Sequence, residues 1–144
     1  MAILQLFIRT PSNLLNFVAL LMKEIKLEFY LKTSPAVLFS RISTPSGLAE
    51  WFADNVKVDG KIFTFFWGDS EQKAEILTTI PNDSISFRWL DMYPENTFGF
   101  NIIQDELTND VALIVTDNID DDEVEDTSKL WGSQVAKLKQ MIGS

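Results

Sequence analysis

The sequence contains no cysteine and no histidine. Without cysteine the chain cannot form a disulfide, use a thiolate in catalysis, or hold zinc or an iron–sulfur cluster through sulfur. Without histidine it lacks the usual general base at neutral pH and the commonest transition-metal ligand. We therefore expect a protein that is not an enzyme and that has no cofactor, no metal site and no catalytic residues. The lack of cysteine also fits a cytoplasmic location.

Positive charge is scarce as well. The chain has 12 lysine and arginine residues against 21 aspartate and glutamate residues, which gives a net charge of -9. This balance opposes electrostatic attraction to the phosphates of nucleic acid and to anionic lipid. The charge therefore predicts neither nucleic acid nor a membrane surface as a partner, and the composition leaves the oligomeric state open.

Apolar and aromatic residues, in contrast, are abundant. Of the 144 residues, 46% are hydrophobic and 12% are aromatic, which is enough to build a sizeable core. A chain of this length has the commonest domain size, so one globular domain is expected.

An apolar extension, residues 1–22, precedes the regular pattern of the domain, which we place at 23–144. Pro11 and its polar neighbours divide the extension, and the remaining apolar run is far shorter than the roughly 20 residues of a membrane-spanning helix. Two interpretations stay open. The extension forms a short helix that packs on the domain, or it lies upstream of a natural start at Met22.

Period-two alternation of apolar and polar residues predicts about seven strands. Turn residues such as Asp59-Gly60 separate them, and short connections of this kind join antiparallel strands. The expected strands are 24–32, 56–58, 62–67, 74–80, 85–89, 98–102 and 111–115.

Three helices are expected. Thr33 or Ser34 precedes Pro35, a pattern typical of a helix start, and a second short helix is expected at 48–52. The acidic stretch 117–126 is expected to end the sheet, to lie in solvent and to introduce a long C-terminal helix. The apolar stripe of that helix consists of Leu130, Trp131, Gln134, Val135, Leu138, Met141 and Ile142.

This order of elements predicts an α+β helix-grip fold. Alternating strands and helices of a doubly wound fold are absent from the pattern. The expected architecture is an antiparallel sheet of about six or seven strands wrapped around the long C-terminal helix, with two short helices after the first strand.

Over residues 23–144 the chain resembles the START-like (SRPBCC) superfamily. The similarity is greatest to the branch related to the C-terminal domain of the activator of the 90-kDa heat-shock chaperone ATPase, and to an uncharacterised bacterial START-like subgroup. The resemblance is carried by Ser34-Pro35-Ala36-Val37-Leu38-Phe39, by the stretch 43–52 with Trp51, by Leu130-Trp131 to Leu138, and, for the subgroup, by 62–67 and 107–113. It implies a hydrophobic cavity between sheet and helix, whereas the branch implies chaperone binding.

The candidate ligand-cavity residues are aromatic side chains of the predicted strands and helices, together with one valine. They are Trp51, Phe63, Phe65, Trp67, Phe87, Trp89, Phe98, Phe100, Trp131 and Val135. Apolar walls of this kind suit a small-molecule site, but the same residues can also form a solid core. Both interpretations stay open.

Two functions are therefore expected to compete. The first is a non-catalytic START-like domain that binds a small hydrophobic ligand between the sheet and the C-terminal helix. The alternative is a protein-interaction module that assists a chaperone and uses the acidic stretch as its surface. A calcium site in that stretch is not favoured, because the spacing lacks the glycine and the final glutamate of an EF-hand loop.

Overall fold

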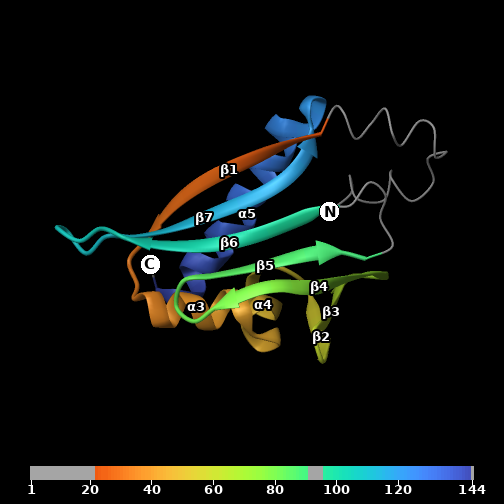
Figure 1. Cartoon of the computed structure of the whole chain (residues 1–144), viewed down its shortest axis with the longest axis horizontal. Helices are drawn as coiled ribbons and strands as arrows, with labels where there is room; N and C mark the ends of the chain where they lie inside the picture. Colours follow the sequence, from red (N-terminus) through yellow and green to blue (C-terminus); the bar gives the residue numbers. More distant parts are fainter. Residues whose placement is uncertain (1–21, 91–95, 144) are drawn as a thin grey trace.

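The structure, a computed structural model, describes residues 22–90 and 96–143. Apart from Met22, the predicted N-terminal extension lies outside these residues. The described chain forms seven strands and three α-helices (Figure 1). In chain order they are β1 (Met22–Leu31), α3 (Pro35–Ser43), α4 (Pro45–Trp51), β2 (Asn55–Asp59), β3 (Ile62–Trp67), β4 (Ser70–Ile80), β5 (Ser84–Trp89), β6 (Thr97–Gln104), β7 (Val111–Asp120) and, after a 3-10 turn at Asp121–Glu123, α5 (Val124–Ile142).

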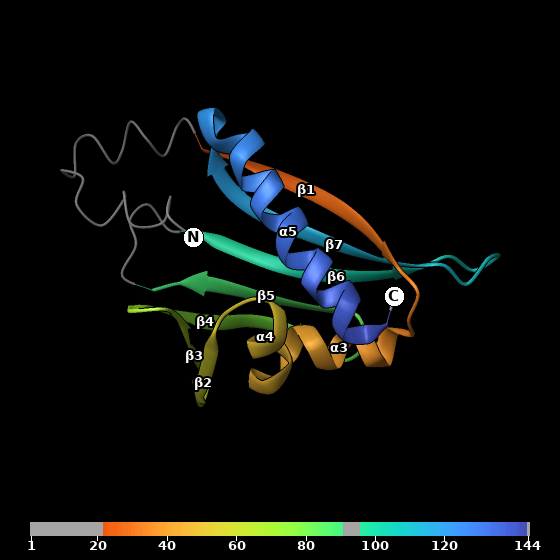
Figure 2. The ribbon, with the colours of Figure 1, turned by 180° about the vertical axis from the view of Figure 1, so that it is seen from behind.

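The seven strands make one antiparallel sheet in the order β1-β7-β6-β5-β4-β3-β2. Neighbouring strands follow one another in the chain except β1, which pairs along its full length with β7. Helix α5 crosses one face of the curved sheet, and α3 and α4 lie beside its C-terminal half (Figure 2). This arrangement confirms the predicted α+β helix-grip fold.

The face of the sheet that α5 covers, here called the inner face, follows the predicted alternation. In β5 the side chains of Ile85, Phe87 and Trp89 are buried there, and in β6 Phe98 and Phe100 are buried beside them. Because successive side chains of a strand point to opposite faces, the polar residues between them lie on the outer face. The alternation of the sequence was therefore sufficient to predict this face.

The alternation fails in β4. The register between β4 and β5 shifts between Ile76 and Thr78, where β4 has a bulge. The extra residue moves the end of the strand to the other face, so Ile80 is 54% exposed although strict alternation had placed it with Ala74 in the core. A bulge leaves no mark in a pattern of apolar residues.

The first short helix begins as predicted, and the second begins at Pro45, earlier than the predicted range 48–52. The Ser34 hydroxyl accepts a hydrogen bond from the Val37 amide at the start of α3, and Pro35 occupies the first turn. The Thr44 hydroxyl does the same for Gly47 in α4. In α5 the predicted stripe is partly wrong, because Leu130 is 39% and Met141 53% exposed.

None of the helices in the described segments has the length and the apolar content that a membrane-crossing helix requires.

Gly47 allows α3 and α4 to approach closely. A Cβ at this position would lie 2.3 Å from the Ser40 carbonyl oxygen and 2.7 Å from the Arg41 Cα, both of which are backbone atoms. We expect Gly47→Ala to lower the free energy of unfolding by about 1–3 kcal/mol, the usual cost of overpacking. Urea unfolding measures this change.

Gly132, in the middle of α5, provides the matched control because a Cβ there would meet nothing within 4 Å. Gly132→Ala should raise the stability by roughly 0.5–1 kcal/mol, since alanine favours the helix. Equal effects of the two substitutions would show that the contact between α3 and α4 is not tight.

Candidate functional site

The structure brings the predicted cavity residues together on the inner face. They come from α4, β3, β5, β6 and α5, and all are buried except Trp67, which is partly buried. These are Trp51, Phe63, Phe65, Trp67, Phe87, Trp89, Phe98, Phe100, Trp131 and Val135.

The aromatic rings of this group pack against one another. The ring centroids of Trp89 and Phe98 are 4.7 Å apart, and those of Phe87 and Phe98 are 5.0 Å apart. Such distances are typical of stacked and edge-to-face pairs, which stabilise a core. The predicted cavity among these residues stays a prediction. Of the hollows described below, one lies at the other end of the sheet, and the other lies on the outer face, with Phe98 and Phe100 among its lining residues.

Phe52, which was not among the predicted site residues, lies at the centre of the group. Its ring stacks at 5.7 Å on that of Trp131 and at 5.6 Å on that of Phe98. Its carbonyl oxygen accepts hydrogen bonds from Trp67 Nε1 at 2.9 Å and from Gln134 Nε2 at 3.1 Å. Phe52, at the end of α4, thus contacts β3 through Trp67, β6 through Phe98, and α5 through Trp131 and Gln134.

Asp117 is a buried carboxylate on the inner face of β7. We expected the acidic stretch from Asp117 onward to end the sheet and to lie in solvent. The first expectation is wrong for residues 117–120, and the second is wrong for Asp117. Strand β7 continues to Asp120, and Asp117 is only 4% exposed. Its carboxylate accepts hydrogen bonds from Trp131 Nε1 at 2.8 Å and from the Asn118 amide at 2.9 Å.

This environment changes the acidity of Asp117. Burial raises the pKa of the carboxyl from 3.8 to about 6, because the charged form loses water. The hydrogen bonds from Trp131 and Asn118 act in the opposite direction. The signal in the sequence was the alternation itself, since Asp117 follows Val115 at a spacing of two.

Asn96, just before β6, is a second buried polar residue that sequence reasoning missed. It is 2% exposed, and neither the nitrogen nor the oxygen of its side-chain amide has a hydrogen-bond partner. The Trp89 amide donates to the Asn96 carbonyl oxygen at 2.9 Å, which continues the pairing of β5 and β6. Asn96 is two residues before Phe98 and shares its face.

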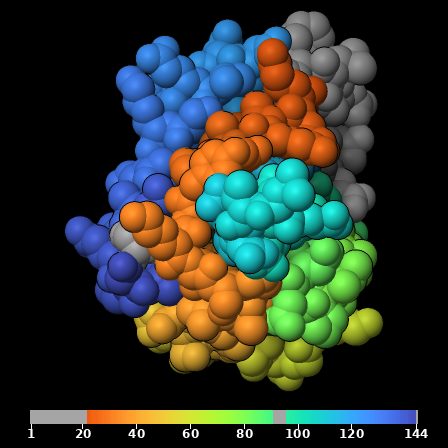
Figure 3. Space-filling view, turned by 90° about the vertical axis from the view of Figure 1, so that its left-hand side faces the viewer, coloured from red at the N-terminus to blue at the C-terminus, as the bar shows by residue number. Residues whose placement is uncertain are grey.

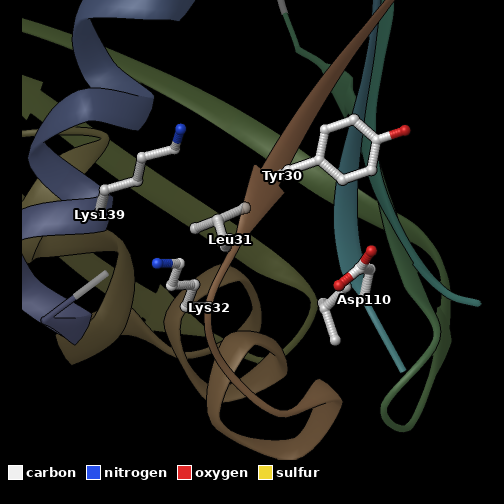
Figure 4. A pocket seen from close by; sticks show the side chains of 6 residues that line it. Tyr30, Leu31, Lys32, Asp110 and Lys139 are labelled. Carbon is white, nitrogen blue, oxygen red and sulfur yellow. The ribbon is translucent and has the colours of Figure 1, made fainter. Parts of the chain in front are cut away.

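A hollow of about 380 Å³ opens at the other end of the sheet, between the end of β1, the start of β7 and the C-terminal part of α5. Leu31 and Val111 form apolar parts of its wall. Figure 4 shows Lys32 and Lys139 on one side of Leu31, with Tyr30 and Asp110 on the other. The hollow is therefore charged at its rim, and none of the predicted cavity residues lines it.

Figure 3 shows this end of the molecule, where β1 and α3, the connection between β6 and β7, and the end of α5 reach one face.

A second hollow of about 280 Å³ lies on the outer face of the sheet. Ser86, Gly99 and Thr116 line it together with Leu77 at the bulge of β4. Its exposed wall is mainly apolar, and Phe98 and Phe100, two of the predicted cavity residues, also contribute to its lining.

In the described part of the chain, no three acidic side chains come close enough together to hold a metal ion.

The raised pKa of Asp117 predicts a specific dependence of stability on pH. The folded protein holds this proton more tightly than the unfolded chain does, so stability falls as the pH rises from about 4 to about 6. Asp117→Asn should remove this component. Between about pH 3.5 and pH 7, the native chain should lose roughly 2–3 kcal/mol relative to the variant in urea unfolding.

Asp105→Asn is a control in which the pH dependence of stability should change in the opposite direction. The amides of Thr108 and Leu107 donate to the Asp105 carboxylate and lower its pKa, so its contribution is present at neutral pH and is lost as the pH falls. A pH profile of Asp117→Asn that parallels the native profile would contradict the assignment of Asp117.

Comparison with known proteins identifies the family. The model of the START-like superfamily domain matches residues 21–144. A protein from Bacteroides fragilis, BfR322, has a solved structure with 41% sequence identity and a TM-score of 0.62, over 84% of this chain and 91% of that chain. No curated protein matches.

Two further solved structures share the fold at lower identity. The Aha1 dimer from Colwellia psychrerythraea has a TM-score of 0.70 at 18% identity, over 81% of this chain and 93% of that chain. The AHSA1 protein from Silicibacter pomeroyi has a TM-score of 0.62 at 20% identity, over 84% of this chain and 98% of that chain. With the family model covering the whole described domain, the chain belongs to the START-like superfamily.

Proposed function

We propose that this START-like domain is a non-catalytic, cytoplasmic module that binds a small hydrophobic ligand between the sheet and α5. The observation that supports the proposal most strongly is Asn96, whose side-chain amide is buried with both of its polar atoms unpaired. Leaving such a group without a partner costs about 1–3 kcal/mol. A ligand that brings a hydrogen-bonding group to this place recovers that free energy.

The composition of the inner face agrees with a ligand site. Small-molecule sites are mostly apolar walls with a few placed polar groups. The buried region between the inner face and α5 has aromatic walls and contains the polar side chains of Asn96, Asp117 and Gln134. Asp117 is held by the Trp131 indole. No nucleophile and base are paired among the described residues of this face, and the proposal therefore assigns binding and not catalysis.

Entry of a ligand requires a rearrangement. Because the rings of Phe52, Phe98 and Trp131 are in contact, an apolar ligand between sheet and helix must separate some of these pairs. The indole of Trp131 would then change its surroundings. Its fluorescence and its NMR signal are expected to report binding.

The first test is native mass spectrometry of the protein purified from its own cells, followed by denaturation and analysis of released small molecules. We expect a stoichiometric apolar molecule. The stripped protein should also bind the neutral fluorescent probe N-phenylnaphthylamine and change the Trp131 signal. Ile103→Thr, on the exposed outer face, should leave probe binding unchanged.

A clean ligand-free mass, together with no thermal shift from a panel of lipids and polyketides, would refute the binding function. Loss of probe binding in Ile103→Thr would show instead that the probe adheres to the outer face.

Similarity of fold to proteins named Aha1 and AHSA1 supports a second candidate function, a protein-interaction module that assists a chaperone. The exposed acids Asp122, Glu125 and Asp126 at the start of α5 would form part of its surface. If so, the purified chain should stimulate ATP hydrolysis by the 90-kDa chaperone of the same cells. Changing these three acids to Asn, Gln and Asn should reduce that stimulation severalfold.

The same number of charges can be removed elsewhere as a control. Asp59, Asp69 and Glu71 are exposed at the β2 end of the sheet, far along the strand order from β1 and β7. Their replacement should leave the ATPase stimulation intact. Unchanged ATP hydrolysis on addition of the native chain would rule out this candidate.

A further inference from the structure

Buried polar side chains gather beneath α5. Four of the five buried polar residues of the described chain lie on the inner face or on the side of α5 that covers it, namely Asn96, Asp117, Thr127 and Gln134. The fifth, Thr64, accepts a hydrogen bond from Lys73 of the neighbouring strand. Polar groups are rare in an aromatic core, because each one costs free energy unless it is paired.

The pairing of these groups is incomplete. Both polar atoms of the Asn96 side chain lack a partner, and Gln134 uses its nitrogen for the Phe52 carbonyl while its oxygen lacks a partner. Asp117 is paired with Trp131 and Asn118, and each carboxylate oxygen keeps a further lone pair. These side chains therefore offer the two N–H donors of Asn96 and several acceptor positions, on Asn96, Asp117 and Gln134, that no described residue uses.

The register of the sheet places Asn96 near Asp117. Phe98 of β6 is paired with Asp117 of β7, and Asn96 is two residues before Phe98. Asn96 precedes the first paired residue of β6. In a ladder continued by two residues, it would be a diagonal neighbour of Asp117 on the same face, with Cα atoms about 7–8 Å apart. A single polar group of a ligand can bond to both, since two hydrogen bonds of ordinary length span roughly 5.5–6 Å.

The chemistry of the two residues selects the polar group. An Asn amide both donates and accepts, whereas a carboxylate only accepts. The best complement is an uncharged group that does both, such as a hydroxyl or an amide. A ligand carboxylate would come within a few ångströms of Asp117 in a buried site, where two like charges repel strongly.

We propose that Asn96 and Asp117 together bind an uncharged hydroxyl or amide group of an otherwise apolar ligand. Trp89 and Phe98, whose rings adjoin the site, would contact the apolar body of that ligand. The inference rests on the proposed ligand-binding function and names the ligand class for the same site.

Displacement of N-phenylnaphthylamine by chemically matched ligands tests the inference. Decanol, decanoic acid and decyl methyl ether share an apolar chain and differ at the polar end. At pH 7.5 decanol should displace the probe from the native chain at a concentration about tenfold lower than either of the others, the effect of one or two hydrogen bonds.

Two substitutions should change this order. Asn96→Leu, which replaces an unpaired buried amide by an apolar group of similar size, should keep the fold and abolish the preference for decanol over the ether. Asp117→Asn removes the negative charge and should bring decanoic acid to within about threefold of decanol. Asn101→Leu is the matched control, since Asn101 is in the same strand but exposed on the outer face.

The outcomes separate this inference from the proposed function. If the native chain binds the probe but shows no preference for decanol, or if Asn96→Leu retains the native preference, the inference is overturned while ligand binding stands. Asn96 would then be satisfied by water. If neither the native chain nor Asn101→Leu binds the probe, the proposed function fails and the inference fails with it. Should Asn96→Leu not fold, the response of Asp117→Asn to decanoic acid decides.

Discussion

The burial of Phe52 is the constraint on which the other layers of this molecule depend. Its ring lies between α5 and the sheet, and its carbonyl oxygen accepts bonds from Trp67 and Gln134. A helix end leaves carbonyl groups without intrahelical partners, and here one of them is used to join a strand and a distant helix. Through Phe52 the end of α4 is therefore connected to β3, to β6 and to α5.

The polar groups under α5 lie next to this apolar centre and lower the free energy of unfolding. Packing alone does not explain why they are present. Asp117 keeps a charge in a place that raises its pKa, and Asn96 leaves a complete amide unpaired. A core selected only for stability would replace them by apolar residues, as most cores do. Their presence at one end of a START-like domain is why we regard this end, and not the lysine-rimmed hollow at the other, as the place where function is encoded.

Much of the fold could be predicted from the sequence because its strands alternate regularly. The pattern from Ile25 onward placed the core side of β1, and the same rule placed the core sides of β5, β6 and β7, whereas 62–67 was predicted as a strand that is apolar on both faces except for Thr64. The same alternation would have placed Asp117 on the inner face, but because the residue is charged we predicted that it would be exposed to solvent. The hydrogen bond from Trp131 explains why a carboxylate is tolerated in the core. The bulge that exposes Ile80 and the unpaired state of Asn96 depend on the register between strands, which no single stretch of sequence records.

The pairing of β1 with β7 has a consequence for how the chain is made. Among the described strands, the first to be synthesised is the partner of the last, with all the others between them in the chain. Contacts between such distant segments form slowly, because a long loop must close before they stabilise anything. During synthesis the meander from β2 to β6 can assemble while β1 waits, with the apolar side chains Leu27 and Phe29 uncovered. The nascent domain thus leaves the apolar side of β1 uncovered until β7 has been synthesised, which makes the interval between the synthesis of β1 and that of β7 its time of greatest exposure to aggregation and to chaperones.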